Sequence, residues 1–144
     1  MRRGFTLLEL ALVIALASIL AGFALPAARR FHDAIVADRA AQAIVAGHRV
    51  ARFSAIMRSR RTLLTVRADS LTVRALDGAD TLTLWVHQGP AANGVTLTGP
   101  SYSLVFAPTG LPIGVSNATF QLARGSVVRR VVVSRLGRTR IVRR

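Results

Sequence analysis

The sequence predicts an α+β protein in which one long N-terminal helix precedes an antiparallel β domain. Two observations predict the helix: residues 5–25 carry a single charged side chain, and residues 27–59 contain no proline and only one glycine. A third predicts the sheet, because short β-branched runs separated by turn residues begin after Arg61. A chain of 144 residues has room for one modest globular domain and one accessory segment.

The apolar residues 5–25 predict a transmembrane helix. At 1.5 Å per residue they would form a helix of about 31 Å, which matches the hydrocarbon thickness of a bilayer. A cleaved secretory signal is the alternative, because Arg2 and Arg3 supply a basic start and residues 22–24 a small-residue cleavage site. Glu9 favours the membrane helix, because a charge inside the bilayer costs roughly 3 kcal/mol and persists only with a partner, whereas an ordinary signal gains nothing from it.

Residues 4–10 read Gly-Phe-Thr-Leu-Leu-Glu-Leu. This run resembles the class III signal of type IV pilins and pseudopilins. The resemblance implies that residues 1–4 form a leader, that prepilin peptidase cuts after Gly4, and that Phe5 becomes the N-methylated N-terminus. It also implies that Glu9 pairs with the N-terminal amine of a neighbouring subunit. One helical turn separates Phe5 from Glu9, so an axially shifted neighbour would bring amine and carboxylate together in a low-dielectric setting.

Pro26 stands where pilin stalks carry a helix-kinking proline, and a proline there removes one helical hydrogen bond. Arginines flank the apolar segment on both sides, so charge asymmetry does not give its orientation. The resemblance implies a single-pass protein of the inner membrane with a cytoplasmic N-terminus and a periplasmic C-terminal domain.

Residues 26–60 are expected to continue the helix as a stalk. Its apolar side chains fall on one side of a helical wheel, with Gln42 and Arg49 among them. We expect this stripe to pack against the sheet rather than to bind a ligand. Its members are Phe31, Ile35, Val45, Phe53, Ile56 and Met57.

Residues 61–144 are expected to form the antiparallel β domain. Asp77-Gly78 and Asn93-Gly94 are good turn formers between the predicted strands. The predicted strands are 62–67, 71–76, 81–87, 95–98, 102–106, 118–123, 127–134 and 138–142.

The C-terminal half resembles the GspH/FimT group of minor pseudopilins. Residues 106–110 resemble that group's F-x-P-x-G element, and residues 130–140 resemble its closing hairpin with a Gly-Arg-x-Arg element at 137–140. Residues 51–56 resemble the end of the group's stalk helix, with Ser54 where an acid is common. The resemblance implies a minor subunit that assembles with other pilins, at or near the tip of a type II secretion pseudopilus or a type IV pilus. The motifs do not distinguish the two systems.

Arginine dominates the charge of the chain. All 20 basic residues are arginine against 6 acids, which gives a formal charge of +14, and no acid follows Asp80. Some members of the FimT branch bind DNA through the Gly-Arg-x-Arg region, so the resemblance makes a DNA-binding patch near the tip a concrete hypothesis. A solvated face, or a docking surface for an acidic neighbouring pseudopilin, remains the alternative. The expected patch consists of Arg129, Arg130, Arg135, Arg138 and Arg140.

Catalytic and metal sites are not predicted. The chain has no cysteine, and His32, His48 and His87 lack the short intervals of a metal site. Nucleophile motifs and glycine-rich phosphate loops are also missing from the sequence. The sequence therefore predicts a structural or binding protein without cofactor or metal, and not an enzyme.

Overall fold

A computed structural model describes residues 6–78, 80–99, 102–114 and 117–143 of the chain. Helix α1 (Leu7–Arg58) comes first, and the chain divides within it into two compact units, residues 1–32 and 33–144. The predicted α+β class is confirmed. The elements that follow α1 are β1 (Arg61–Val66), β2 (Ser70–Asp77), β3 (Asp80–Gln88), the 3₁₀ helix η1 (Pro90–Asn93), β4 (Thr96–Thr98), β5 (Tyr102–Phe106), β6 (Pro112–Ile113), β7 (Ala118–Arg124), β8 (Val127–Val133) and β9 (Thr139–Arg143).

The first unit contains the N-terminal part of α1, and all of its described side chains are exposed. This part of the helix is long and apolar enough to cross a membrane. The helix continues through Pro26, whose ring lacks the N–H that would donate to the carbonyl one turn earlier. Ser18 lies within the apolar stretch, and its hydroxyl donates to the carbonyl of Ile14 at 2.8 Å. This bond satisfies the hydroxyl inside the helix, as a lipid environment requires.

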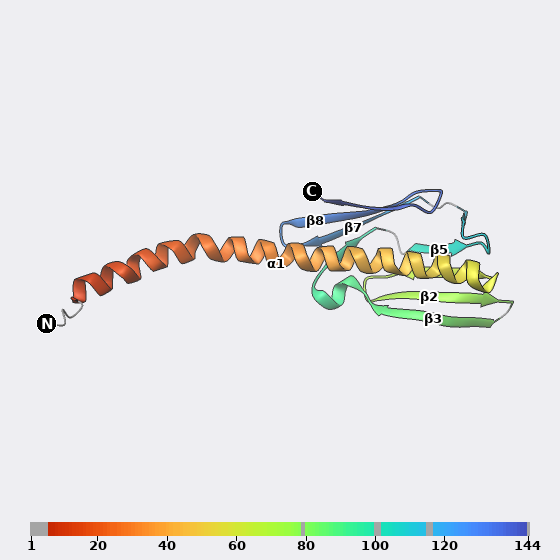
Figure 1. Ribbon diagram of the computed structural model, residues 1–144, viewed down its shortest axis with the longest axis horizontal. Coiled ribbons are helices and arrows are strands. Elements are labelled where there is room, and N and C mark those ends of the chain that lie inside the picture. The colour runs from red at the N-terminus through yellow and green to blue at the C-terminus, as the bar shows by residue number, and fades with distance from the viewer. Residues whose placement is uncertain (1–5, 79, 100–101, 115–116, 144) are drawn as a thin grey trace. The chain divides into compact units, whose positions relative to one another are not determined.

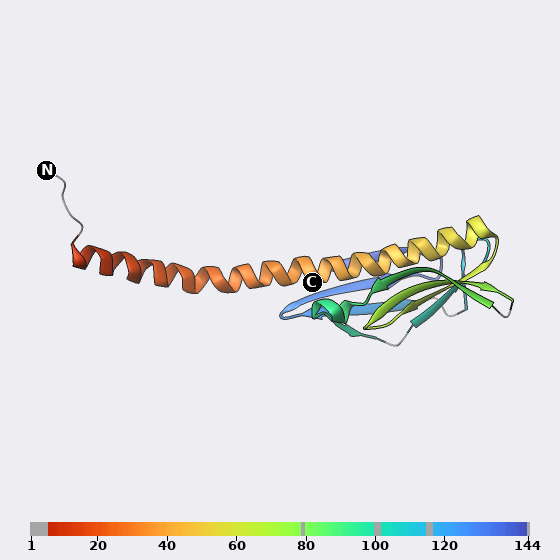
Figure 2. The same ribbon diagram turned by 90° about the horizontal axis from the view of Figure 1, so that it is seen from below.

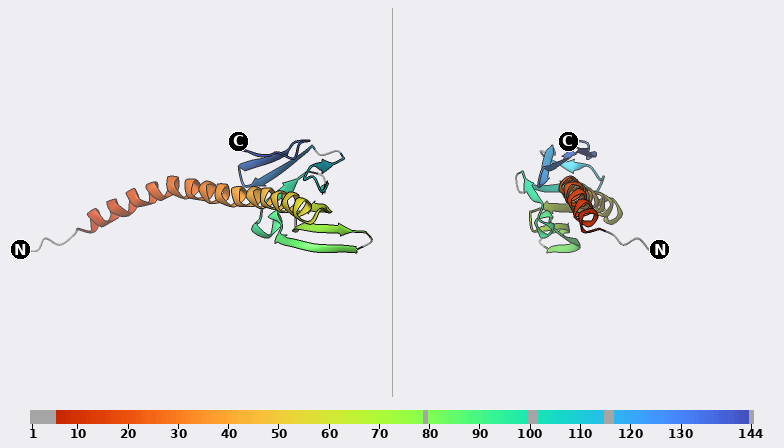
Figure 3. Two further views of the ribbon diagram at one scale, coloured as in Figure 1. Left: turned by 45° about the vertical axis from the view of Figure 1, so that its right-hand side comes forward. Right: turned by 90° about the vertical axis from the view of Figure 1, so that its left-hand side faces the viewer.

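The second unit consists of the rest of α1 and two antiparallel sheets. Sheet A has the strand order β3-β2-β1-β5-β6, and sheet B has the order β4-β7-β8-β9. Within this unit, Figure 1 shows α1 passing between β8 on one side and β2 and β3 on the other. The view turned by 90° places both sheets on the same side of the helix (Figure 2), and the oblique view shows them diverging along it (Figure 3).

The helix buries a face made mainly of alanines against the two sheets. Ala37, Ala41, Ala51 and Ala55 are fully buried, and a Cβ on Gly47 would lie 3.0 Å from the ring of Trp85. Such small residues let the strands approach the helix closely. The larger side chains of the core come mostly from the strands: Leu64, Val66, Leu71, Val73, Leu104 and Phe106 of sheet A, and Phe120, Leu122, Val131 and Val133 of sheet B.

The predicted apolar stripe on the stalk is therefore largely wrong. Val45 is buried in the core, but Phe31, Phe53 and Met57 are 70%, 65% and 67% exposed, and Ile35 and Ile56 are also exposed. Alanines occupy most of the packing face because small side chains let the sheets approach the helix closely, although Ile44 and His48 are also buried there. The bulky residues consequently lie on the outer side.

The eight predicted strands agree with the structure to within one residue at every end. The short strand β6 was not predicted, because two residues that begin with a proline give no alternating pattern. The helix ends where Ser59 adopts a positive φ of 50°, and the N–H of Arg60 donates to the carbonyl of Ala55. This is the hydrogen bond of a Schellman-type helix end.

Candidate functional site

The start of α1 holds Glu9, the predicted assembly residue. Gly4 and Phe5, the predicted processing residues, lie outside the described residues. The backbone N–H of Glu9 donates to the Thr6 hydroxyl at 3.2 Å, and the N–H of Leu10 donates to the Thr6 carbonyl at 3.1 Å. Thr6 thus caps the helix, and the Thr-x-x-Glu spacing is that of a capping box. The Glu9 carboxylate lies in the first turn of α1, at the positive end of the helix dipole.

The helix around Glu9 presents large apolar side chains on all sides. Leu7 and Leu8 are 86% and 81% exposed, and every described residue of this unit is exposed with them. The described residues of this unit form no core of their own that could bury this surface. It can be covered by lipid or by the same segment of other subunits.

Three arginines of sheet B form ion pairs with two aspartates of the stalk. Asp33 accepts from Arg124 Nε at 2.8 Å, and Asp38 accepts from Arg129 Nε at 2.7 Å. Arg143 Nε lies 3.6 Å from the same Asp38 carboxylate. These pairs hold β7, β8 and β9 to the helix, and Arg129 is only 8% exposed.

The prediction that placed Arg129 in an exposed patch is therefore wrong. Side chains alternate between the two faces of a strand, so the neighbours Arg129 and Arg130 of β8 point in opposite directions. Arg129 lies on the inner face with Val131 and Val133, which are buried in the core. The sequence alone did not show which of the two adjacent arginines would face the helix.

The remaining predicted arginines lie at the surface of the β8–β9 hairpin. Val132 pairs with Arg140 and Arg130 pairs with Val142, so Arg130 and Arg140 share the outer face of sheet B. Arg135 and Arg138 are exposed in the connecting turn. The N–H of Arg138 donates to Ser134 Oγ at 3.1 Å, and its carbonyl accepts from the N–H of Ser134 at 2.9 Å. All five predicted arginines therefore belong to this hairpin, with four on its outer face or turn and Arg129 on its inner face.

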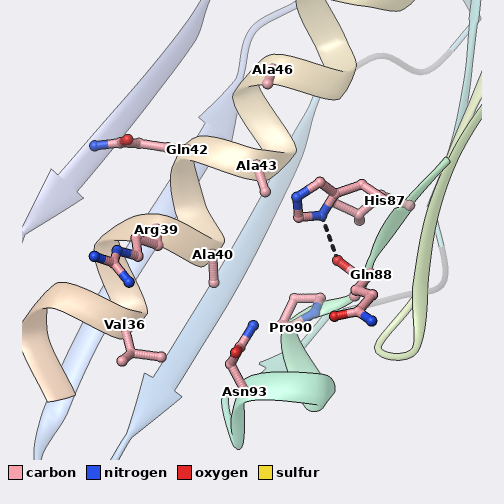
Figure 4. Close-up of a pocket in the computed structure, with 12 residues that line it drawn as sticks. Val36, Arg39, Ala40, Gln42, Ala43, Ala46, His87, Gln88, Pro90 and Asn93 are labelled. Carbon is pink, nitrogen blue, oxygen red and sulfur yellow. Dashed lines mark hydrogen bonds between the residues drawn. The ribbon is translucent and has the colours of Figure 1, made fainter. Parts of the chain in front are cut away.

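A cavity of about 480 Å³ lies in the second unit between α1, the end of β3 and η1 (Figure 4). Val36, Ala40 and Ala43 of the helix face Pro90 and Asn93 across it. Its lining contains no carboxylate. Sequence reasoning missed this cavity because its lining comes from segments far apart in the chain.

His87, which lines the same cavity, is held in a fixed orientation. Its Nδ1 donates to the Gln88 carbonyl at 2.7 Å, and its ring stacks on Trp85 with centroids 5.5 Å apart. Within the described residues, no group of three or more His, Cys, Asp or Glu side chains is placed to hold a metal ion.

His48 is the most strongly perturbed group of the stalk. It is 3% exposed, its ring meets the ring of Phe106 edge-on at 5.0 Å, and its Nε2 has no hydrogen-bond partner among the described residues. Burial lowers the pKa of His48 to about 4, and the charges of Arg52 and Arg49 add to this effect. The imidazole is therefore neutral at ordinary pH, and it serves as a core residue.

Comparisons with known proteins place the chain in a family. Residues 40–137 match the family described as type II transport protein GspH, and residues 1–25 match the prokaryotic N-terminal methylation motif. The chain belongs to the GspH family. The predicted resemblance to this group and to the methylated pilins is thereby confirmed.

Individual relatives agree with the family. The GspH-family chain is 31% identical to the "Pilin-like protein PilA1" of Thermus thermophilus, with 97% of this chain and 98% of that protein covered. Its fold is similar to crystal structures of the type IV minor pilin FimU of Pseudomonas aeruginosa. In the P21 crystal form the TM-score is 0.62 at 20% identity, with 73% of this chain and 87% of FimU covered. In the P65 form the TM-score is 0.60 at 19% identity, with 73% and 91% covered.

Membership in the GspH family settles the general role of the chain. It is a minor pilin or pseudopilin of type II secretion or type IV pilus systems, and its role is structural rather than enzymatic. Other pilins as partners and processing by prepilin peptidase follow from the family. Its apolar N-terminal helix is typical of prepilins anchored in the inner membrane.

Proposed function

We propose that the chain is cut after Gly4 and then joins a type II secretion pseudopilus or a type IV pilus as a minor subunit that primes assembly, at or near the filament tip. Before assembly it spans the inner membrane with a cytoplasmic N-terminus and residues 33–144 in the periplasm. The observation that supports this proposal is the exposed apolar first part of α1, in which Glu9 is the only charge between Leu7 and Leu25. Lipid can cover such a surface before assembly, and the same helix of other subunits can cover it in the filament.

Assembly proceeds by head-to-tail packing of these helices, a contact that builds an open filament without closing. The amine of the processed Phe5 neutralises Glu9 of a neighbour, so each charge offsets the desolvation of the other. Only one axial offset brings the two groups together, so the pair sets the register. Pro26 interrupts the hydrogen-bond ladder of α1 and gives the helix a point at which it can bend within the filament.

Substitution of Glu9 tests the register role. Glu9→Ala and Glu9→Gln remove the charge that pairs with the amine, so we expect normal insertion into the membrane but loss of assembled filaments or of secretion. Glu9→Asp is the matched control, because it keeps the charge and we expect partial function. Membrane fractionation and the yield of sheared filaments measure the two steps separately. Normal filaments from Glu9→Ala would remove the register role.

Mass spectrometry of the mature chain tests the processing. The proposal requires a chain that begins at N-methylated Phe5. A chain that begins at Leu25 would instead support a cleaved secretory signal. A chain that keeps Met1 in cells with an active prepilin peptidase would equally contradict the proposal.

DNA binding by the β8–β9 hairpin is a second candidate function. The observation that favours it is the placement of Arg130 and Arg140 on one outer face, with Arg135 and Arg138 exposed in the adjoining turn. Guanidinium groups suit phosphate oxygens, and no acid follows Asp80 in the sequence. The stalk carboxylates Asp33 and Asp38 pair with other arginines of sheet B. Binding through phosphates would be independent of base sequence and strongly weakened by salt.

A gel-shift titration of the full chain in detergent, at increasing salt, tests this function. The Arg138→Ala, Arg140→Ala double variant is expected to lose about tenfold or more in affinity for duplex DNA. Arg74→Ala is the matched control, because Arg74 is an exposed arginine of sheet A. Unchanged affinity in the double variant would exclude these two residues from DNA binding.

A further inference from the structure

Large apolar side chains are exposed at the C-terminal end of α1. Phe53, Ile56 and Met57 lie on the last two turns of the helix and are 65%, 46% and 67% exposed. Leu111, in the segment between β5 and β6, is 49% exposed, and Leu136, in the β8–β9 turn, is 70% exposed. Exposed apolar residues that gather in one place mark interaction surfaces.

Two close approaches show that the three segments are neighbours. A Cβ on Gly110 would lie 2.7 Å from Ile56 Cδ1, so the segment that carries Leu111 lies directly against the helix. A Cβ on Gly137 would lie 3.3 Å from Pro112 Cδ, so the turn that carries Leu136 lies against the same segment. Figure 1 shows the ends of α1 and β5 on the same side of the second unit.

The charged side chains that the described residues place beside these apolar groups are arginines, and the carboxylate at the same end of α1, Asp77, is paired with Arg60. Arg52 lies beside Ile56, with its Cγ 3.4 Å from the same Gly110 position. Arg135 and Arg138 flank Leu136 in sequence and are exposed. Residues 39–68 and 81–144, which supply the whole region, contain no aspartate or glutamate. We define the docking surface as Phe53, Ile56, Met57, Leu111 and Leu136 together with Arg52, Arg135 and Arg138.

The composition of the docking surface selects the kind of partner. DNA offers phosphates and base edges, which engage polar groups, so five apolar side chains would gain little from it. A second copy of the chain would present the same positive charge, and facing like charges oppose association. Aromatic, methionine and arginine side chains are enriched at protein interfaces. A partner with an apolar patch surrounded by acidic residues would complement both the apolar side chains and the arginines of the docking surface.

We propose that the docking surface binds an acidic face of a different pilin-like subunit. This inference rests on the proposed function, because it takes the partner from the same filament system. The apolar side chains supply the contact area, and the arginines select a partner with carboxylates around that area. In this proposal Arg138 lies within the docking surface, whereas Arg140 on the outer face of sheet B lies outside it.

Photo-cross-linking of the full chain in its own cells tests the contact. A photoreactive residue at Leu136 should form an adduct with one pilin-like subunit whose non-helical domain is acidic. Val86 of β3 is the matched control position, because it is 64% exposed on sheet A, and no such adduct is expected there. An adduct at Leu136 with DNA, with lipid, with a second copy or with a basic protein would overturn the proposal, as would no adduct or the same adduct at both positions.

Binding of the purified partner then tests the chemistry. Leu136→Ser and Arg138→Ala should each weaken the affinity of the full chain by about tenfold. Val86→Ser and Arg140→Ala should leave it within about twofold, and added NaCl should weaken binding to the unaltered chain. Salt-independent binding, or equal losses in all four variants, would overturn the proposal. Glu9→Ala separates this test from the proposed function, because the adduct at Leu136 should persist in membranes even where filaments are lost.

Discussion

The two units of the chain obtain their stability in different ways. The described part of residues 1–32 is a helix with no buried side chain, whereas residues 33–144 close a core between the alanine face of α1 and two sheets. The first unit therefore depends on lipid or on other subunits, and the second depends on its own packing. Substitutions in the first unit should alter assembly, and substitutions in the second should alter unfolding.

The largest expected difference in the free energy of unfolding is between alanine substitutions of two glycines, one in each unit. A Cβ on Gly89 would lie 2.3 Å from the carbonyl oxygen of Ala68, with no flexible group to yield, so Gly89→Ala should lower the free energy of unfolding by about 3 kcal/mol. Gly22 has nothing within 4 Å, and Gly22→Ala should leave unfolding unchanged. Urea unfolding followed by the fluorescence of Trp85, the single tryptophan, measures both. Equal stabilities would contradict the close contact at Gly89.

A smaller difference in the free energy of unfolding is expected between alanine substitutions of the buried Arg129 in β8 and the exposed Arg140 in β9. Arg129→Ala leaves Asp38 without its closest partner in a half-buried site, so we expect a loss of about 2 to 3 kcal/mol. Arg140→Ala changes an exposed side chain on the outer face and should alter stability by less than about 0.5 kcal/mol. The same unfolding assay measures this difference. If Arg129→Ala were as stable as Arg140→Ala, the Asp38 pair would have no structural role.

The smallest of the three effects concerns pH. Burial lowers the pKa of His48 to about 4 from the model-peptide value of 6.5, so the unfolded chain binds the proton more tightly than the folded one. The stability contributed by neutral His48 is fully present above pH 6.5 and is lost as the pH falls towards 4. Between pH 7 and pH 5 the loss amounts to about 2 kcal/mol. His48→Gln should flatten this part of the pH profile, and an unchanged slope would mean that other groups cause it.

Much of the fold follows from local patterns in the sequence. The apolar run predicts the first part of α1. The β-branched runs predict the strands, because side chains alternate between the two faces of an antiparallel strand and apolar residues therefore recur at every second position. The packing face of the stalk was not predicted, since large apolar residues such as Phe53 usually indicate the core. Here Ala41 and Ala51 lie on the packing face, because the close approach of the sheets favours small side chains there over larger and more hydrophobic ones.

The candidate site was predictable to a similar extent. Glu9 stands out in the sequence by its isolation in an apolar segment, and the hairpin arginines stand out by their number. Their roles stay predictions. The opposite orientations of Arg129 and Arg130 depend on the register of β8 with β7 and β9, which only the folded chain supplies. The docking surface was missed because its members belong to three segments that the turns at Gly110 and Gly137 bring together.

The ion pairs of Asp33 and Asp38 have a practical consequence for soluble expression. A chain shortened to begin at residue 40 would keep most of the alanine face but lose both carboxylates. Arg129 and Arg143, which pair across β8 and β9, would then lose their shared carboxylate, and Arg124 would lose its own, so sheet B would be held to the stalk by its core contacts without these ion pairs. A shortened chain that begins between residue 26 and Asp33 lacks the apolar segment and still keeps both carboxylates.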